Sequence, residues 1–227
     1  MRLFGNLLGK VLREQAGEHI LSAVETLRKG YIRLRIKDDP GLRARLVRLI
    51  EHLDPDDLTD VVRAFNLYFS LVNIAEESFQ HEQRRKLVHR DQPLWVGSFS
   101  RTLQEFHAEG MQPYQLQILL NQALYLPVFT AHPTEAIRRT VMFALRRLFL
   151  TSNQLNDKRL SKDERAAIQL ELRRQIQVLW KTDEVRVHKP TVEQEIRSGL
   201  YFFRKSLFDA IPQTYRYLEK AIRRVYG

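Results

Sequence analysis

The sequence predicts a mostly α-helical chain that contains a single β-strand, and three observations support this prediction. Apolar residues recur at the spacing of amphipathic helices over most of the 227 residues. Helix-start signals precede several of these runs, among them Ser161 with Glu164 and Thr191 with Gln194. Only residues 124–130 have the pattern of a strand, an apolar run that leads into a polar turn.

Length and composition limit the possible classes of protein. The hydrophobic content of 44% is ordinary for a soluble globular protein, and 227 residues suffice for one or two domains. The chain has no cysteine, which excludes disulfides, thiol nucleophiles and cysteine-bound metals. A net charge of +10 suits anionic partners. The apolar start is broken by Asn6 and Lys10, and no apolar run approaches membrane-spanning length, so we expect a cytoplasmic protein.

Residues 1–123 are predicted to form an N-terminal helical region. Amphipathic runs cover about residues 2–35 and 42–53, and Asp54-Pro55 starts a long helix. Within the apolar stripe of this long helix, the residues that we expect in the core are Leu58, Val62, Phe65, Phe69 and Val72. Its polar end carries Glu76, Glu77, His81 and Glu82, but no Glu-x-x-His or His-Glu-x-x-His pattern occurs, so we predict no metal site there.

Residues 124–227 are predicted to form a second region that opens with the strand. An amphipathic helix is expected from Glu135 to about Leu150, and a polar loop is expected over residues 151–160. Further helices follow Ser161 and Thr191, and Pro212 is expected to kink or divide the last helical stretch.

The strongest candidate site lies between the strand and the helix, in the sequence Val-Phe-Thr-Ala-His-Pro-Thr-Glu-Ala-Ile-Arg-Arg of residues 128–139. Pro133 disfavours helical φ/ψ at the residue before it, so His132 is expected on a bent, defined backbone. An imidazole changes its protonation state near neutral pH, which suits general acid–base catalysis.

The residues after Pro133 fit a helix start beside an anion. Thr134 is a good N-cap, and Glu135 suits the positive end of the following helix. Arg138 and Arg139 would lie one turn into that helix, and at least one could turn back toward an anion. The same residues also fit a purely structural turn followed by a solvated basic face.

The whole segment resembles the histidine motif of the phosphoenolpyruvate carboxylase family. Two further stretches agree with it. Residues 65–77, Phe-Asn-Leu-Tyr-Phe-Ser-Leu-Val-Asn-Ile-Ala-Glu-Glu, followed by Gln83-Arg84-Arg85, resemble a long N-terminal helix of the family. Residues 180–186, 189–191 and 195–200 resemble the segment that follows the histidine motif. Together the three stretches span about residues 42–201.

This resemblance implies the N-terminal portion of a much longer enzyme with a helix-decorated (β/α)8 barrel of the TIM type. Residues 124–130 would supply its first strand, and the helices before it would be decoration. The metal-binding carboxylates, a second catalytic histidine, a glycine-rich mobile loop and the allosteric site would all lie after residue 227.

The resemblance also implies a reaction, in which phosphoenolpyruvate and bicarbonate give oxaloacetate and phosphate. The enzyme would be a homotetrameric lyase that uses Mg²⁺ or Mn²⁺ in anaplerotic carbon fixation. His132 would be the catalytic histidine, acting between carboxyphosphate and C–C bond formation. The residues that would shape the site or contact anions are Thr130, Thr134, Glu135, Arg138 and Arg139. The 227 residues alone are expected to be inactive, with no nucleic-acid or membrane partner.

Two other interpretations fit the sequence. The basic charge and arginine content favour a helical nucleic-acid-binding or scaffold module without catalysis. A regulatory paralogue could also keep the fold without the chemistry.

Glu184 and Arg186, close to Trp180, are predicted to serve the structure around the site more than the chemistry.

Overall fold

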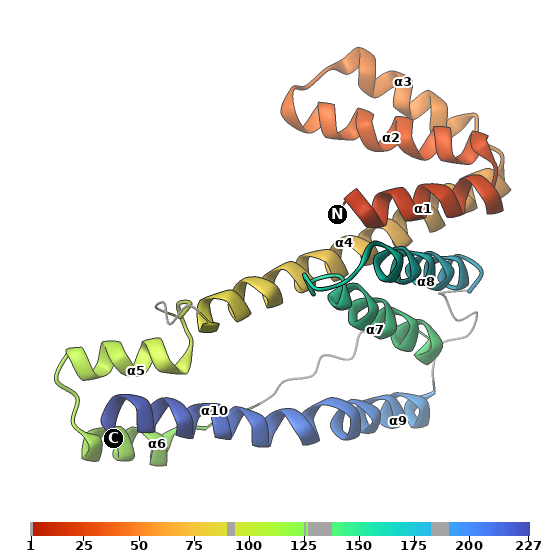
Figure 1. Cartoon of the computed structure of the whole chain (residues 1–227). Helices are drawn as coiled ribbons and strands as arrows, with labels where there is room; N and C mark the ends of the chain where they lie inside the picture. The colour runs from red at the N-terminus through yellow and green to blue at the C-terminus, as the bar shows by residue number, and fades with distance from the viewer. Residues whose placement is uncertain (1, 90–93, 125, 127–137, 183–190) are drawn as a thin grey trace. The chain divides into compact units, whose positions relative to one another are not determined.

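The structure is a computed structural model that describes residues 2–89, 94–124, 126, 138–182 and 191–227. All the secondary-structure elements in these parts of the chain are helices (Figure 1). The chain forms two compact units, one of residues 1–81 with 137–185 and one of residues 82–136 with 186–227. Each unit thus draws on both regions expected from the sequence, 1–123 and 124–227, and that division of the longer protein stays a prediction.

The first unit is built on helices from both ends of its sequence. Its elements are α1 (Arg2–Gln15), α2 (Glu18–Ile36), α3 (Pro40–Glu51), most of α4 (Pro55–His89), α7 (Arg139–Gln154) and α8 (Lys162–Trp180). α2 packs against α1 and α3, whereas α8 packs against α1 and α7 (Figure 1). One continuous core joins them, and its fully buried large side chains are Val11, Leu12, Ile20, Leu67, Leu71, Leu148, Leu172 and Ile176.

Local sequence signals account for several of the helix starts in this unit. The Asp39 carboxylate accepts the Leu42 amide at 2.9 Å, with Pro40 as the first helical residue of α3. Asp54 accepts the Asp57 amide at 2.8 Å in the same way at the start of α4. These caps satisfy amide groups that a helix leaves without partners in its first turn.

The buried face of α4 differs from the face predicted. Leu58, Val62 and Phe69 are exposed by 37%, 51% and 58%, so their assignment to the core is wrong for this chain. Phe65 and Val72 are half-buried. The side chains that fill the core come from the neighbouring face and are Val61, Ala64, Leu67, Leu71 and Ile74. Both faces are apolar, so hydrophobic spacing alone could not decide which one faces the core of the first unit.

The second unit contains the end of α4, four further α-helices and one short π-helix. These are α5 (Phe99–Ala108), α6 (Pro113–Gln122), α9 (Val192–Phe202), the π-helix η1 (Phe203–Leu207) and α10 (Phe208–Tyr226). Its small core consists of Leu103, Leu116 and Ala221, with apolar neighbours from α6 and α10. Pro212 lies inside α10 and does not divide it; the irregularity in this stretch is η1, which immediately precedes α10.

The predicted strand lies almost entirely outside the described residues. Of residues 124–130, only Leu124 and Leu126 are described, and neither belongs to a strand. The barrel strand therefore stays a prediction. The expected polar loop over residues 151–160 begins later than predicted, because α7 continues to Gln154. Among the described helices, none is long and apolar enough to cross a membrane.

Candidate functional site

The candidate site contains residues that the structure describes and residues that it does not. His132, Thr130, Thr134 and Glu135 lie outside the described residues. Arg138 and the backbone of Arg139 are described, and they connect the motif to α7. The geometry available at this site is therefore that of the helix that follows the histidine and of the groups that hold this helix in place.

α7 begins later than the sequence suggested. Arg138 has φ −61° and ψ 139°, which is an extended backbone, and it is the N-cap of a helix whose first residue is Arg139. The Arg138 carbonyl oxygen accepts the amides of Val141 at 2.9 Å and Met142 at 3.2 Å. The prediction of one helix running from Glu135 to about Leu150 is therefore wrong, because it cannot pass through an extended residue.

This later start changes the electrostatic setting of the two arginines. Arg138 and Arg139 occupy the N-terminal end of α7 rather than a position one turn inside it. The first amides of a helix lack intrahelical acceptors, and the helix dipole is positive at this end. The Arg138 side chain is half-buried. An anion near the end of the motif would thus meet a guanidinium charge and the positive end of a helix together.

α7 contacts the other helices of the first unit along its length. Val141 is 3% exposed and Leu148 is fully buried, and both belong to the main core. Near the end of α7, the Ser78 hydroxyl of α4 donates to Asn153 Oδ1 at 2.5 Å. Gln175 Nε2 of α8 donates to Thr151 Oγ1 at 3.1 Å. The helix that leaves the motif is therefore held by both apolar and polar contacts.

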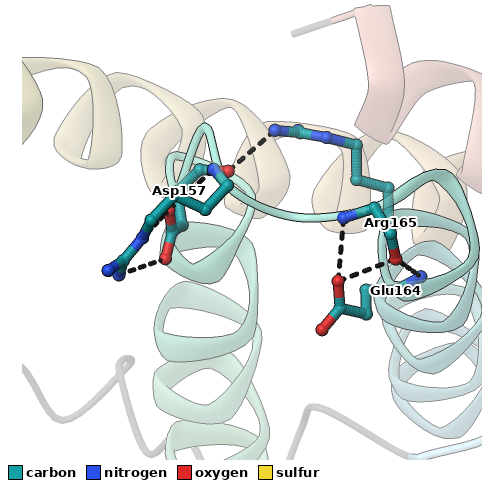
Figure 2. Close-up of polar contacts among 5 residues, drawn as sticks. Asp157, Glu164 and Arg165 are labelled. Carbon is teal, nitrogen blue, oxygen red and sulfur yellow. Dashed lines mark hydrogen bonds and ion pairs between the residues drawn. The ribbon is translucent and has the colours of Figure 1, made fainter.

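Side-chain hydrogen bonds hold the turn between α7 and α8. Figure 2 shows those around Asp157, Glu164 and Arg165. Arg165 Nη1 donates to the carbonyl oxygen of Leu155 at 3.0 Å, and its Nη2 donates to that of Asp157 at 2.7 Å. Ser161 and Glu164 form the predicted capping box, with the Ser161 amide 2.8 Å from Glu164 Oε2. The turn is held at both the end of α7 and the start of α8.

Acidic groups near this hairpin are held ionised by their neighbours. The side-chain hydrogen bonds from Arg159 lower the pKa of Asp157 to about 2. The Gln175 amide, and then the charge of Arg147, lower the pKa of Glu171. These carboxylates are therefore poor proton donors at neutral pH. Their arrangement supports a structural role in the hairpin rather than acid catalysis.

The third stretch of the family resemblance is described only at its edges. Trp180, the last residue of α8, is 4% exposed, and the Arg63 guanidinium lies 5.8 Å from the centre of its ring. Residues 183–190, which include Glu184 and Arg186, lie outside the described residues. The structural role assigned to Glu184 and Arg186 stays a prediction.

The acidic end of α4 has partners other than a metal ion. Glu82 pairs with Lys86 at 2.8 Å, Gln80 Nε2 donates to Glu76 at 3.3 Å, and the His81 ring lies edge-on to Phe149. Within the described parts of the chain, no group of three or more histidine, aspartate or glutamate side chains could hold a metal. These residues therefore supply no ligand set for Mg²⁺ or Mn²⁺.

The first unit contains a groove that was not predicted from the sequence. A groove of about 750 Å³ lies among α1, α2 and α4, with the glycines Gly5 and Gly9 and the cations Lys10 and Arg28 on its walls. Glycines carry no chemical signal of their own, so the pattern of the sequence did not indicate this groove. All its lining residues come from α1, α2 and α4, and none belongs to the histidine motif.

Comparison with known proteins defines the class to which this helical framework and its motif belong. A family model described as phosphoenolpyruvate carboxylase matches residues 1–227. Phosphoenolpyruvate carboxylase of Roseiflexus castenholzii is 40% identical over 231 residues, which cover 100% of this chain and 24% of the relative. The phosphoenolpyruvate carboxylase of Nitrosomonas eutropha is 33% identical, over 99% of this chain and 24% of the relative. That of Paraburkholderia xenovorans is 34% identical, over 98% of this chain and 22% of the relative.

These matches confirm the family to which the motif pointed. The chain belongs to the phosphoenolpyruvate carboxylase family. It spans about a quarter of the length of the curated relatives that it matches. The alternative of a nucleic-acid-binding or scaffold module finds no support in these comparisons.

Proposed function

We propose that the full-length protein that contains this chain is an active phosphoenolpyruvate carboxylase, and that this chain is its N-terminal part. The observation that carries the proposal is the family match over residues 1–227, which includes the complete histidine motif. The reaction would convert phosphoenolpyruvate and bicarbonate into oxaloacetate and phosphate. In this setting residues 124–130 would form the first strand of a (β/α)8 barrel, with its neighbouring strands outside this chain.

The proposed chemistry has two stages. A bicarbonate oxygen attacks the phosphorus of phosphoenolpyruvate, the bond from phosphorus to the enol oxygen breaks, and carboxyphosphate and the enolate of pyruvate form. Carboxyphosphate then separates into CO₂ and phosphate, and the enolate carbon attacks CO₂ to form the new C–C bond. His132 would act in this second stage, where an imidazole can hold a proton or stabilise the charge that develops.

The residues around His132 would hold the anionic groups. Arg138 and Arg139 are proposed to contact phosphate or carboxylate oxygens, which match the fork geometry of a guanidinium. Their place at the N-terminal end of α7 supports this role, because the helix adds positive potential there. Thr130, Thr134 and Glu135 would shape the same site through the turn that carries the histidine.

A divalent cation, Mg²⁺ or Mn²⁺, would stabilise negative charge on the enolate oxygen. The described residues do not fit such an ion, because no suitable cluster of ligands lies among them. We propose, as the family resemblance implies, that its ligands lie in the full-length protein after residue 227. A homotetrameric assembly, allosteric control and a cytoplasmic location belong to the same proposal.

The test is the substitution His132→Asn in the full-length protein. This change keeps the size of the side chain but removes the titratable nitrogen, so oxaloacetate formation should fall by at least about 100-fold. Phosphoenolpyruvate binding should survive, and bicarbonate-dependent phosphate release could continue. His89→Asn is the matched control, because His89 is an exposed residue of α4 outside the motif, and it should leave turnover unchanged.

Three outcomes would contradict the proposal. Near-normal oxaloacetate formation by a folded His132→Asn protein would remove the catalytic role of the histidine. Absence of activity in the unmodified full-length protein would favour a regulatory paralogue. Activity in the isolated 227 residues would contradict the assignment of the metal ligands to other parts of the protein.

A further inference from the structure

An apolar seam on the outside of α4 is only partly covered within the first unit. The seam consists of Leu58, Val62, Phe65, Phe69 and Val72, which follow one another at alternating intervals of four and three residues. Leu58, Val62 and Phe69 are exposed, and Phe65 and Val72 are half-buried. Alternating intervals of three and four are the spacing by which one helix packs along another.

The stretch around the seam is almost free of charge. Arg63 is the only charged residue between Asp60 and Glu76, although 28% of the whole chain is charged. Its guanidinium lies over the ring of the buried Trp180, 5.8 Å from the centroid. The exposed residues that flank the seam are Thr59, Asn66 and Asn73, which are polar but uncharged. A helix that faces water on one side ordinarily carries charges there, whereas a helix that is apolar or neutral all round is ordinarily buried.

The seam is also continuous with the core of the first unit. Phe65 and Tyr68 are partly buried and pack against the main core cluster. Phe69 extends this aromatic layer outward, with its ring 6.4 Å from that of Phe65 and 5.7 Å from that of Tyr68. The exposed ring is therefore the outer edge of an existing core and not an isolated surface side chain.

We propose that the α4 seam is the docking surface for a helix of the same polypeptide, drawn from the part of the full-length protein outside these 227 residues. The relatives are much longer than this chain, which covers only 24% of the length of the Roseiflexus castenholzii protein. We expect the helix to come from the corresponding additional sequence of the full-length protein. The seam runs over 14 residue steps, so it is about 21 Å long and matches a helix of about four turns.

The features of the seam favour this occupant over a second copy of the chain. Helices that pair between separate chains commonly carry charged residues beside the apolar seam, where they select the partner. Here Asn66 and Asn73 lie beside the seam, and one edge of the seam merges with the core of its own unit. A neutral border and a shared core are typical of packing within one folded domain.

Photo-crosslinking in the full-length protein tests the proposal. The variant Phe69→p-benzoylphenylalanine places a light-activated group on the seam, and Asp163→p-benzoylphenylalanine places the same group on the exposed first turn of α8 as a control. Irradiation of the first variant should give products of monomer mass on a denaturing gel. Peptide mass spectrometry should join position 69 to residues outside the 227, with a yield at least about ten times that of the control.

Other results would overturn the proposal. A product of twice the monomer mass would identify a second copy as the occupant. Crosslinks confined to residues 1–227, or a yield no higher than that of the control, would show that the seam is not covered by the rest of the polypeptide. None of these readouts depends on catalysis, so a failure of the proposed carboxylase activity would be seen separately in oxaloacetate formation.

A milder variant covers the case in which the bulky group prevents folding. The described chain has no cysteine, so Val62→Cys introduces a single thiol into this part of the protein. In the folded full-length protein, maleimide labelling of position 62 should be at least about ten times slower than labelling of Asp163→Cys. Equal labelling rates would contradict burial of the seam.

Discussion

Removal of the Arg165 guanidinium tests whether side-chain hydrogen bonds hold the turn that follows α7. Arg165 donates to the carbonyl oxygens of Leu155 at 3.0 Å and Asp157 at 2.7 Å. Figure 2 shows the bond to Asp157. A helix leaves its last carbonyl groups without intrahelical partners, so a donor from another element stabilises this end. In Arg165→Ala, both oxygens lose a cationic donor. The turn should then open more often, although the caps of α8 remain.

The size of the effect follows from the number of bonds and their exposure. A hydrogen bond with a charged partner contributes about 1.5–3 kcal/mol, so two such bonds set an upper range of about 3–6 kcal/mol. Arg165 is half-buried, and water can replace part of the bonding, so we expect a loss of about 2–3 kcal/mol in the free energy of local opening. Since about 1.4 kcal/mol corresponds to a factor of ten, this loss predicts amide exchange about 30 to 150 times faster.

Hydrogen exchange followed by mass spectrometry in the full-length protein measures this change locally. The reporters are the amides of Leu155, Asn156 and Asp157, each of which donates to a carbonyl oxygen three residues earlier at 3.1 Å. Lys158→Ala is the matched control, because it removes an exposed cation of the same turn. Unchanged exchange in Arg165→Ala, or an equal acceleration in Lys158→Ala, would refute the reasoning.

Three further predictions concern the first unit. Leu148→Ala, at a fully buried position of α7, should cost about 2–5 kcal/mol and lower the denaturant midpoint. Gly30→Ala should cost about 1 kcal/mol net in the same assay, because overpacking against the buried Leu46, 2.6 Å from the new Cβ, outweighs the gain in helix propensity. Arg28 lowers the pKa of Glu25 to about 2, below its ordinary value of 4.5. The stabilisation of the folded protein by this ion pair is therefore complete above pH 4.5 and is lost as the pH falls toward 2. Melting temperatures of Glu25→Gln and the unmodified protein should therefore converge in acid.

Helix starts that depend on side-chain caps could be predicted from the sequence. Ser161 with Glu164 and Thr191 with Gln194 both form capping boxes, and α8 and α9 begin at the next residue in each case. A cap is a local interaction between residues three apart, so it depends little on the rest of the fold. The mostly helical class and the family were predictable for related reasons, because each depends on patterns contained within this chain.

The choice between the two apolar faces of α4 depends on partners far away in the sequence. Val61 and Leu67 face the core that α4 shares with α1 and α8, whereas Val62 and Phe69 face outward. Ala64 is fully buried, and its small side chain allows neighbouring helices to approach closely on that side. The sequence marked both faces as apolar and could not say which one these 227 residues would cover. The missed assignment is therefore informative, because it identifies the face that we expect the longer protein to bury.

The start of α7 illustrates a second limit, which bears directly on the site. Thr134 followed by Glu135 is a favourable helix start, whereas Arg138 makes no side-chain cap hydrogen bond. The extended backbone of Arg138 nevertheless places the start at Arg139, so local capping preference did not decide it. Arg138 and Arg139 consequently lie at the N-terminal end of the helix, where the helix dipole is positive. The anion-binding role of Arg138 and Arg139 stays a prediction, now attached to the first residues of α7 rather than to its second turn.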